Sequence, residues 1–172
     1  AHAEVNALEK INYKGGNTNV YITLEPCTHF GKTPPCADAL IRAGVKKVFI
    51  AMLDPNPLVS GRGVMALQDS GIEVEVGLLE EEANKINRGF VKRMTGGLPF
   101  VTSKIAMSLD GKTAMKNRES KWITSKASRE GVQMLRSLDQ AILTGSGTIK
   151  SDNPMMTVRT GSADSNPLRV VI

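Results

Sequence analysis

The chain has 172 residues, 41% of them hydrophobic and 23% charged, with a formal net charge of +5 at pH 7. This composition is ordinary for a globular protein with a core, and no apolar run approaches the roughly 18 to 20 residues that span a bilayer. With scattered basic residues, only one Trp, two Tyr and four Phe, and no secretion signal, we expect a cytoplasmic protein that binds neither membranes nor nucleic acid and prefers a small anionic ligand.

Helix and strand patterns alternate through the first half. Apolar residues at positions 5, 8 and 11 form one stripe of a helix, and alternation over 19–24, closed by Pro26, predicts a strand that delivers Cys27 at its carboxyl end. A nearly continuous apolar run over 45–53 predicts a strand covered on both faces. Further helices are predicted over 37–43, with Gly44 at the C′ position, over 64–69 and over 80–94, and a further strand over 72–76.

The pattern restarts after the turn-rich residues 95–99. It predicts strands over 100–107, 140–144, 156–159 and 168–172, a turn at Asp110-Gly111, and a helix over 125–138. Such alternation is typical of layered α/β domains. We therefore expect two α/β units, 1–96 and 97–172, and because the chain starts without Met and ends inside a strand pattern, we expect it to be an internal piece of a longer polypeptide.

A set of metal-binding residue types stands in the first unit. His2-Ala-Glu4, Pro26-Cys27 and Cys36 supply one imidazole, two thiols and a spare carboxylate, the inventory of a catalytic zinc site with one position open for water. The same pattern is the signature of zinc deaminases, in which His and two Cys hold the metal and Glu moves the proton. It predicts replacement of an exocyclic ring amine by oxygen.

The spacing of these residues sets a geometric condition. Residues i and i+2 of a regular helix point about 200° apart, so His2 and Glu4 can share a site only if His2 lies at the helix entrance. Eight residues separate Cys27 from Cys36, where deaminases commonly have two. This insertion carries His29 and Lys32, both suited to contact a ring or a phosphate. Two buried structural cysteines, or a purely structural zinc site, remain alternatives.

The second unit has a weaker motif. Gly145-Ser-Gly147-Thr148 at a predicted strand end allows close approach of an anionic group, but the full glycine fingerprint of a dinucleotide site is absent. From the residues alone, nucleotide binding and an ordinary surface loop both remain open.

With these motifs the chain resembles the bifunctional deaminase–reductase family of riboflavin biosynthesis. The resemblance rests on His2-Ala-Glu4, on the stretch Glu25-Pro-Cys-Thr-His-Phe-Gly-Lys-Thr-Pro-Pro-Cys36, on Asp54-Pro-Asn-Pro57 with Gly61-Arg-Gly63, and on several stretches of the second unit. The insertion between the two cysteines distinguishes this family from nucleoside and tRNA deaminases. It implies an α/β fold: a cytidine-deaminase-like three-layer domain followed by a partial dihydrofolate-reductase-like domain.

The resemblance also implies chemistry and site residues. The first domain would use one zinc ion, held by His2, Cys27 and Cys36, with Glu4 for proton transfer, to deaminate a diamino-pyrimidinone bearing a ribosyl phosphate. The second would use NADPH to reduce the ribosyl group to ribityl. The deaminase would bind substrate through His29 and Lys32; the reductase would contact NADPH through Ala106, Trp122, Thr148 and Asp152, and its substrate through Lys104, Ser120, Arg136, Met156 and Arg159.

Two rival functions remain open at this point. A single-function zinc deaminase of nucleosides or tRNA explains the metal motif but leaves the second unit without a task. A non-enzymatic, zinc-stabilised binding module would hold its metal with four protein ligands and no open position. The oligomeric state does not follow from the motifs, and a homo-oligomer is our working expectation.

Overall fold

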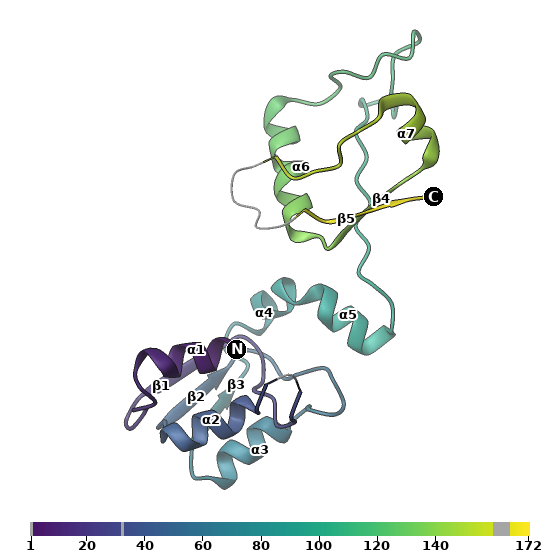
Figure 1. The fold of residues 1–172 in the computed structure, drawn as a ribbon. Coiled ribbons are helices and arrows are strands. Elements are labelled where there is room, and N and C mark those ends of the chain that lie inside the picture. The colour runs from purple at the N-terminus through teal and green to yellow at the C-terminus, as the bar shows by residue number, and fades with distance from the viewer. Residues whose placement is uncertain (1, 32, 160–165) are drawn as a thin grey trace. The chain divides into compact units, whose positions relative to one another are not determined.

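The structure, a computed structural model, describes residues 2–31, 33–159 and 166–172. The chain forms two compact units, Ala1–Thr102 and Ser103–Ile172, and each is described by itself (Figure 1). Helices and parallel strands alternate in both units, so the predicted α/β class is confirmed. Within the described ranges, no helix has both the length and the apolar character needed to cross a membrane.

The first unit is built on a parallel sheet of three strands in the order β1-β2-β3. The register aligns Tyr21, Phe49 and Glu75 across the sheet. Before and between the strands run three helices of eight residues each (Figure 1). The bounds are β1 Asn19–Ile22, β2 Lys47–Ile50, β3 Glu73–Val76, α1 Ala3–Lys10, α2 Cys36–Ala43 and α3 Arg62–Asp69.

The larger of the two buried hydrophobic clusters of this unit lies on one face of the sheet. Val48 and Ile50 of the central strand are fully buried because they point to the same face, two residues apart. They pack in one cluster with Leu8, Leu40 and Leu67, one residue from each of α1, α2 and α3. The three helices are therefore held to the sheet by burial of apolar surface, the main favourable contribution to folding.

The prediction of one long helix over 80–94 is wrong about its continuity. The structure has two helices there, α4 Glu80–Ile86 and α5 Arg88–Gly96. The break falls at Asn87, whose side-chain Nδ2 donates to the carbonyl of Ala83 at 3.0 Å. Asparagine side chains compete with the backbone for such bonds, which disfavours this residue inside a helix.

The second unit contains a parallel pair of strands, β4 Ala141–Thr144 and β5 Leu168–Val171. The helix α6, Lys126–Leu138, begins after Ser125, whose hydroxyl accepts from the N–H of Ser128 at 3.2 Å, as a good N-cap does. A second helix, α7 Ser146–Asp152, directly follows β4. The sequence-based bounds for α6, β4 and β5 agree with these to within one or two residues.

Two predicted strands of this unit are wrong. Residues 100–107 and 156–159 have extended apolar patterns, yet neither lies in a sheet. A strand exists only where its backbone N–H and C=O groups find a neighbouring strand, and in the described part of the chain the sheet of this unit contains only β4 and β5.

Gly15 packs so closely that we expect no larger residue to be tolerated there. A Cβ atom at this position would lie 2.8 Å from both the Ala43 carbonyl oxygen and Val45 Cγ1. Gly15→Ala should therefore lower the free energy of unfolding by about 1–3 kcal/mol through overpacking, read as a lower urea midpoint at unchanged slope. Gly16→Ala is the matched control, because nothing lies within 4 Å of a Cβ there; equal midpoints for the two variants would contradict this account.

Candidate functional site

The three predicted metal ligands meet where β1 ends and where α1 and α2 begin. His2 is the N-cap residue of α1, with an extended backbone at φ −75° and ψ 161°. His2 therefore stands outside the regular helix, where its side chain would point about 200° away from that of Glu4. This meets the condition derived from the sequence, that His2 must lie at the helix entrance for the two residues to share a site. Cys36 is the first residue of α2, and Cys27 follows the end of β1 by five positions.

The ligand atoms lie at distances that a zinc ion can bridge. His2 Nδ1 is 3.0 Å from Cys36 Sγ and 3.8 Å from Cys27 Sγ, and all three ligand atoms lie within 4.8 Å of one another. Tetrahedral zinc, with bonds of about 2.0–2.3 Å to N and S, places its ligand atoms roughly 3.3–3.8 Å apart. The donor set and its spacing therefore fit one zinc ion.

Local electrostatics make this a place for a cation. Burial raises the pKa of the Cys36 thiol well above its usual range, and the neighbouring Glu4 and Cys27 side chains raise it further. The sulfur of Cys27 accepts the backbone N–H of Cys36 at 3.4 Å. A cation among these groups would offset both the burial and the repulsion, and its binding would release the thiol proton.

Glu4 lies beside the ligand atoms without being one of the three. Its Oε2 is 3.6 Å from Cys36 Sγ, and its side chain is half-buried in the first turn of α1. A carboxylate at such a position can accept and return a proton close to the metal without coordinating it. The arrangement has three ligands and one separate proton carrier.

The structure adds two buried carboxyl groups that the sequence reasoning did not assign to the site. Glu25 is 3% exposed and Asp54 is 8% exposed. Burial raises the pKa of Asp54, the Asn56 N–H that donates to its Oδ1 at 2.8 Å lowers it in part, and smaller opposing effects come from Glu25 and His29. The only sequence signals for this pair were the Glu25-Pro-Cys27 context and the turn-rich stretch after Asp54. His29 itself is exposed, and Lys32 lies outside the described residues.

In the second unit, two predicted substrate residues are brought together. Burial lowers the pKa of Arg136, and the positive charge of Arg159 lowers it further. The two arginines are held by separate contacts: Arg136 Nη1 donates to the Thr157 carbonyl at 3.2 Å, and the Arg159 N–H donates to Gln133 Oε1 at 3.1 Å. These contacts join α6 to the segment 157–159, and a guanidinium group on each of the two segments suits an anion.

The other predicted residues of this unit are more dispersed. Thr148 and Asp152 are exposed on α7, Met156 is buried, and Trp122 is exposed with Arg129 stacked 4.2 Å from its ring. In the described ranges, Lys104, Ala106 and Ser120 make no hydrogen bond to Arg136 or Arg159.

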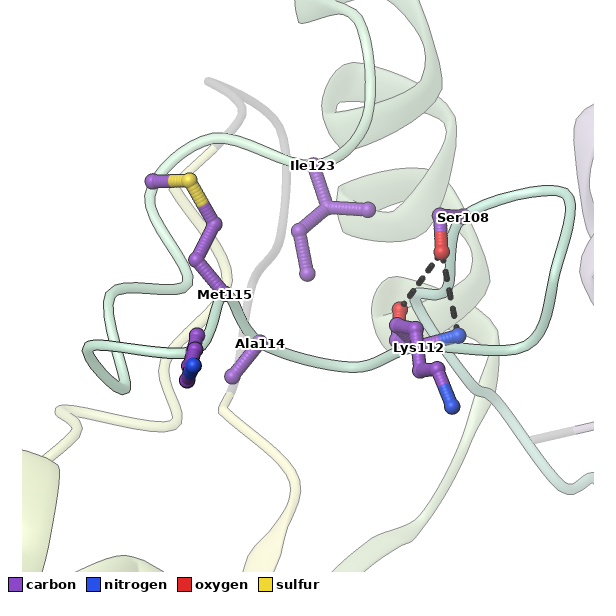
Figure 2. Close-up of a pocket in the computed structure, with 6 residues that line it drawn as sticks. Ser108, Lys112, Ala114, Met115 and Ile123 are labelled. Atoms are coloured by element: carbon purple, nitrogen blue, oxygen red, sulfur yellow. Dashed lines mark hydrogen bonds between the residues drawn. The ribbon is translucent and has the colours of Figure 1, made fainter.

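The second unit also has an open cavity of about 440 Å³. Figure 2 shows its lining and the Ser108 hydroxyl, which accepts from the Lys112 N–H at 3.0 Å and donates to the carbonyl oxygen of the same residue at 3.2 Å. None of the residues predicted from the sequence lines this cavity. Its lining residues are Ser108, Lys112, Ala114, Met115, Lys116 and Ile123.

Comparison with protein families assigns the two ends of the chain separately. Residues 1–52 match the model of the cytidine and deoxycytidylate deaminase zinc-binding region. Residues 99–172 match the model of the RibD C-terminal domain. The first match includes all three candidate ligands and Glu4, and the second includes both arginines.

Individual relatives match along the whole chain. The chain is 50% identical to the riboflavin biosynthesis protein RibD of Bacillus amyloliquefaciens, over 100% of this chain and 46% of the relative. It is 48% identical to the Escherichia coli protein of the same name, over 99% of this chain and 50% of the relative.

Solved structures agree with these matches. A diaminohydroxyphosphoribosylaminopyrimidine deaminase/5-amino-6-(5-phosphoribosylamino)uracil reductase from Thermotoga maritima is 45% identical with a TM-score of 0.90, over 99% of this chain and 49% of that one. The Acinetobacter baumannii RibD structure is 47% identical with a TM-score of 0.89, over the same shares of the two chains. The chain thus spans about half the length of the relatives it matches, and over the whole of that span it is similar to the RibD proteins of riboflavin biosynthesis.

Proposed function

We propose that the first unit catalyses hydrolytic deamination at a zinc site formed by His2, Cys27 and Cys36. The observation that carries this proposal is the cluster of three ligand atoms within 4.8 Å of one another, with the Glu4 carboxylate beside it and outside the ligand set. A fourth protein ligand would favour a structural zinc site instead. In the described residues, the metal-binding cluster contains only these three side chains.

The chain's own residues would divide the chemistry as follows. Zinc, when bound, supplies Lewis acidity that activates water at neutral pH. Glu4 takes up a proton and returns it to the departing amine as ammonia forms. His29 and Lys32 would hold the substrate ring and its phosphate. The ring amine is replaced by oxygen, and no electrons are exchanged.

For the substrate, we propose 2,5-diamino-6-ribosylamino-4(3H)-pyrimidinone 5′-phosphate. The names of the Thermotoga and curated relatives support this choice, and the cationic residues of both units suit a phosphorylated ligand. For the location, we propose the cytoplasm. A homo-oligomer that binds neither nucleic acid nor membranes remains part of this proposal.

The second unit would reduce the ribosyl group to ribityl with NADPH. The hydride belongs to the cofactor, and the protein positions the sugar against it. Ala106, Trp122, Thr148 and Asp152 would contact NADPH. The arginine pair would hold the ribose phosphate, with the remaining substrate contacts from Lys104, Ser120 and Met156. The deaminase and reductase domains are proposed to divide at about residue 97, within the linker that follows α5.

The test of the whole proposal is a pair of assays on the intact protein with the phosphorylated diamino-pyrimidinone. We expect one zinc per chain, ammonia release that needs zinc, and NADPH oxidation that needs the deaminated product. Ammonia release from a nucleoside or from tRNA, without NADPH oxidation, would favour the single-function deaminase. Zinc binding without either activity would favour the binding module.

Arg159 should affect substrate binding more than cofactor binding. Arg159→Ala removes one of two guanidinium groups at the proposed phosphate position, so KM for the substrate should rise by about 10- to 100-fold, the loss of a charge-assisted hydrogen bond. The Kd for NADPH, from fluorescence titration, should change little. Lys126→Ala is the charge-matched control, since Lys126 has an 85% exposed side chain in the same unit. Equal weakening of substrate and NADPH would contradict the assignment.

A further inference from the structure

The buried carboxylate of Glu25 accepts four backbone hydrogen bonds. Its Oε2 accepts the N–H groups of Asp54 at 3.1 Å and Gly61 at 3.0 Å, and its Oε1 accepts those of Gly63 at 2.8 Å and Val64 at 3.2 Å. The donors come from the loop after β2 and from the start of α3, 29 to 39 positions along the chain. One side chain therefore joins the end of β1 to two segments distant in sequence.

Glu25 also takes the place of an N-cap residue for α3. The helix begins after Gly61, at φ 80°, which has no side chain to cap the first N–H groups. Free N–H groups at a helix start carry partial positive charge and are stabilised by an anion. The carboxylate of Glu25 reaches them from the sheet, and a buried carboxylate is tolerated only with such partners.

The backbone of Gly63 packs closely against Glu25 and Pro26. A Cβ at Gly63 would lie 2.3 Å from the Pro26 carbonyl oxygen and 3.1 Å from Glu25 Oε1. The Glu25 N–H donates to the Met52 carbonyl at 3.0 Å. Pro26 is fully buried and has a ring-fixed φ. From Glu25 to Cys27 the chain is thus a short arm held at both ends, because the Cys27 carbonyl accepts the N–H of Ala37 at 3.2 Å and the Cys27 sulfur accepts the N–H of Cys36 at 3.4 Å.

We propose that Glu25 is a positioning residue for the metal centre, which fixes the direction of the Cys27 sulfur by anchoring this arm to α3 and to the Asp54 loop. Asp54 is held by the same carboxylate through its N–H, so the buried Asp54 carboxyl group and the metal ligand Cys27 share one anchor. Glu25 touches neither metal nor substrate and acts only through Cys27 and Asp54. The inference rests on the zinc site proposed above.

Glu25→Gln is the sharpest test, because the change is isosteric. Each carboxylate oxygen faces two N–H donors, so whichever way the amide is oriented, its NH2 group opposes two of them. The arm should shift, and the cobalt-substituted intact protein should show altered thiolate-to-cobalt and d–d absorption bands. Zinc loss to a chelator should be about 10-fold faster, the range seen for partners outside the ligand set.

The matched control is Ile72→Val, which removes one methylene group from the hydrophobic core. Ile72 precedes β3 at its amino end, whereas the metal ligands lie at the opposite end of the parallel strands. It should leave the cobalt spectrum and the zinc-loss rate unchanged, which separates positioning from general destabilisation. If Glu25→Gln does not fold, Glu25→Asp, which keeps the charge but is one methylene shorter, must show the same spectral change.

Two outcomes are decisive against the proposals, and they are distinguishable. An unaltered protein that binds neither zinc nor cobalt overturns the metal site and this inference with it. An unaltered protein with normal metal binding, together with a folded Glu25 variant whose spectrum and zinc-loss rate match it, overturns the positioning role alone.

Discussion

In the Glu4→Gln variant, ammonia release should fall by about 10²- to 10⁴-fold while the zinc content stays at that of the unaltered protein. The carboxylate lies 3.6 Å from Cys36 Sγ and outside the three-ligand cluster, so removing its proton affinity should stop proton transfer without removing a ligand. Glutamine keeps the size and shape of the side chain but cannot accept and return a proton at neutral pH. The measurements are ammonia release and zinc per chain on the same preparation.

Glu9→Gln is the matched control for this prediction. Glu9 lies on the same helix, α1, and is exposed, so its neutralisation changes the charge of the helix equally and leaves the site alone. Full ammonia release in Glu4→Gln would remove Glu4 from the mechanism. Loss of zinc in that variant would make Glu4 a ligand, and the site would then have four protein ligands and a structural character.

Local patterns predicted most elements because their causes are local. The helix α2 ends where Gly44 adopts φ 66°, a conformation that glycine adopts without strain, and Ser125 caps α6 with its own hydroxyl. The strands predicted over 100–107 and 156–159 failed because a strand depends on a partner elsewhere in the chain, which its own residues do not specify. The break at Asn87 was missed because it is confined to one residue, with φ −94° and ψ 11°, inside an otherwise continuous helical stripe.

The residues of the site also divide into those that the sequence predicts and those that only the folded chain reveals. His2, Glu4, Cys27 and Cys36 could be singled out in sequence because few residue types bind zinc and their order is distinctive. The role of Glu25 could not, because its partners are four backbone N–H groups, and every residue except proline carries one. Only the folded chain shows which of them converge on this carboxylate.

The chain contains two histidines, and they should give opposite results when each is replaced by alanine. His2→Ala removes a ligand atom that lies 3.0 Å and 3.8 Å from the two sulfurs. Zinc affinity should therefore fall by more than the roughly 10- to 100-fold that loss of an outer partner costs, and ammonia release should be lost with the metal. His29→Ala should keep one zinc per chain and raise KM for the pyrimidine by about 10-fold, the cost of one hydrogen bond.

This pair separates metal binding from substrate binding within one residue type. His29 is exposed and is not one of the three residues of the metal-binding cluster, so its loss should leave the ligand atoms where they are. Retention of zinc by His2→Ala would mean that the two thiols hold the metal with another group, which contradicts the proposed site. Zinc loss in His29→Ala would place that imidazole among the ligands. It would then no longer be a candidate substrate contact in the loop between Cys27 and Cys36.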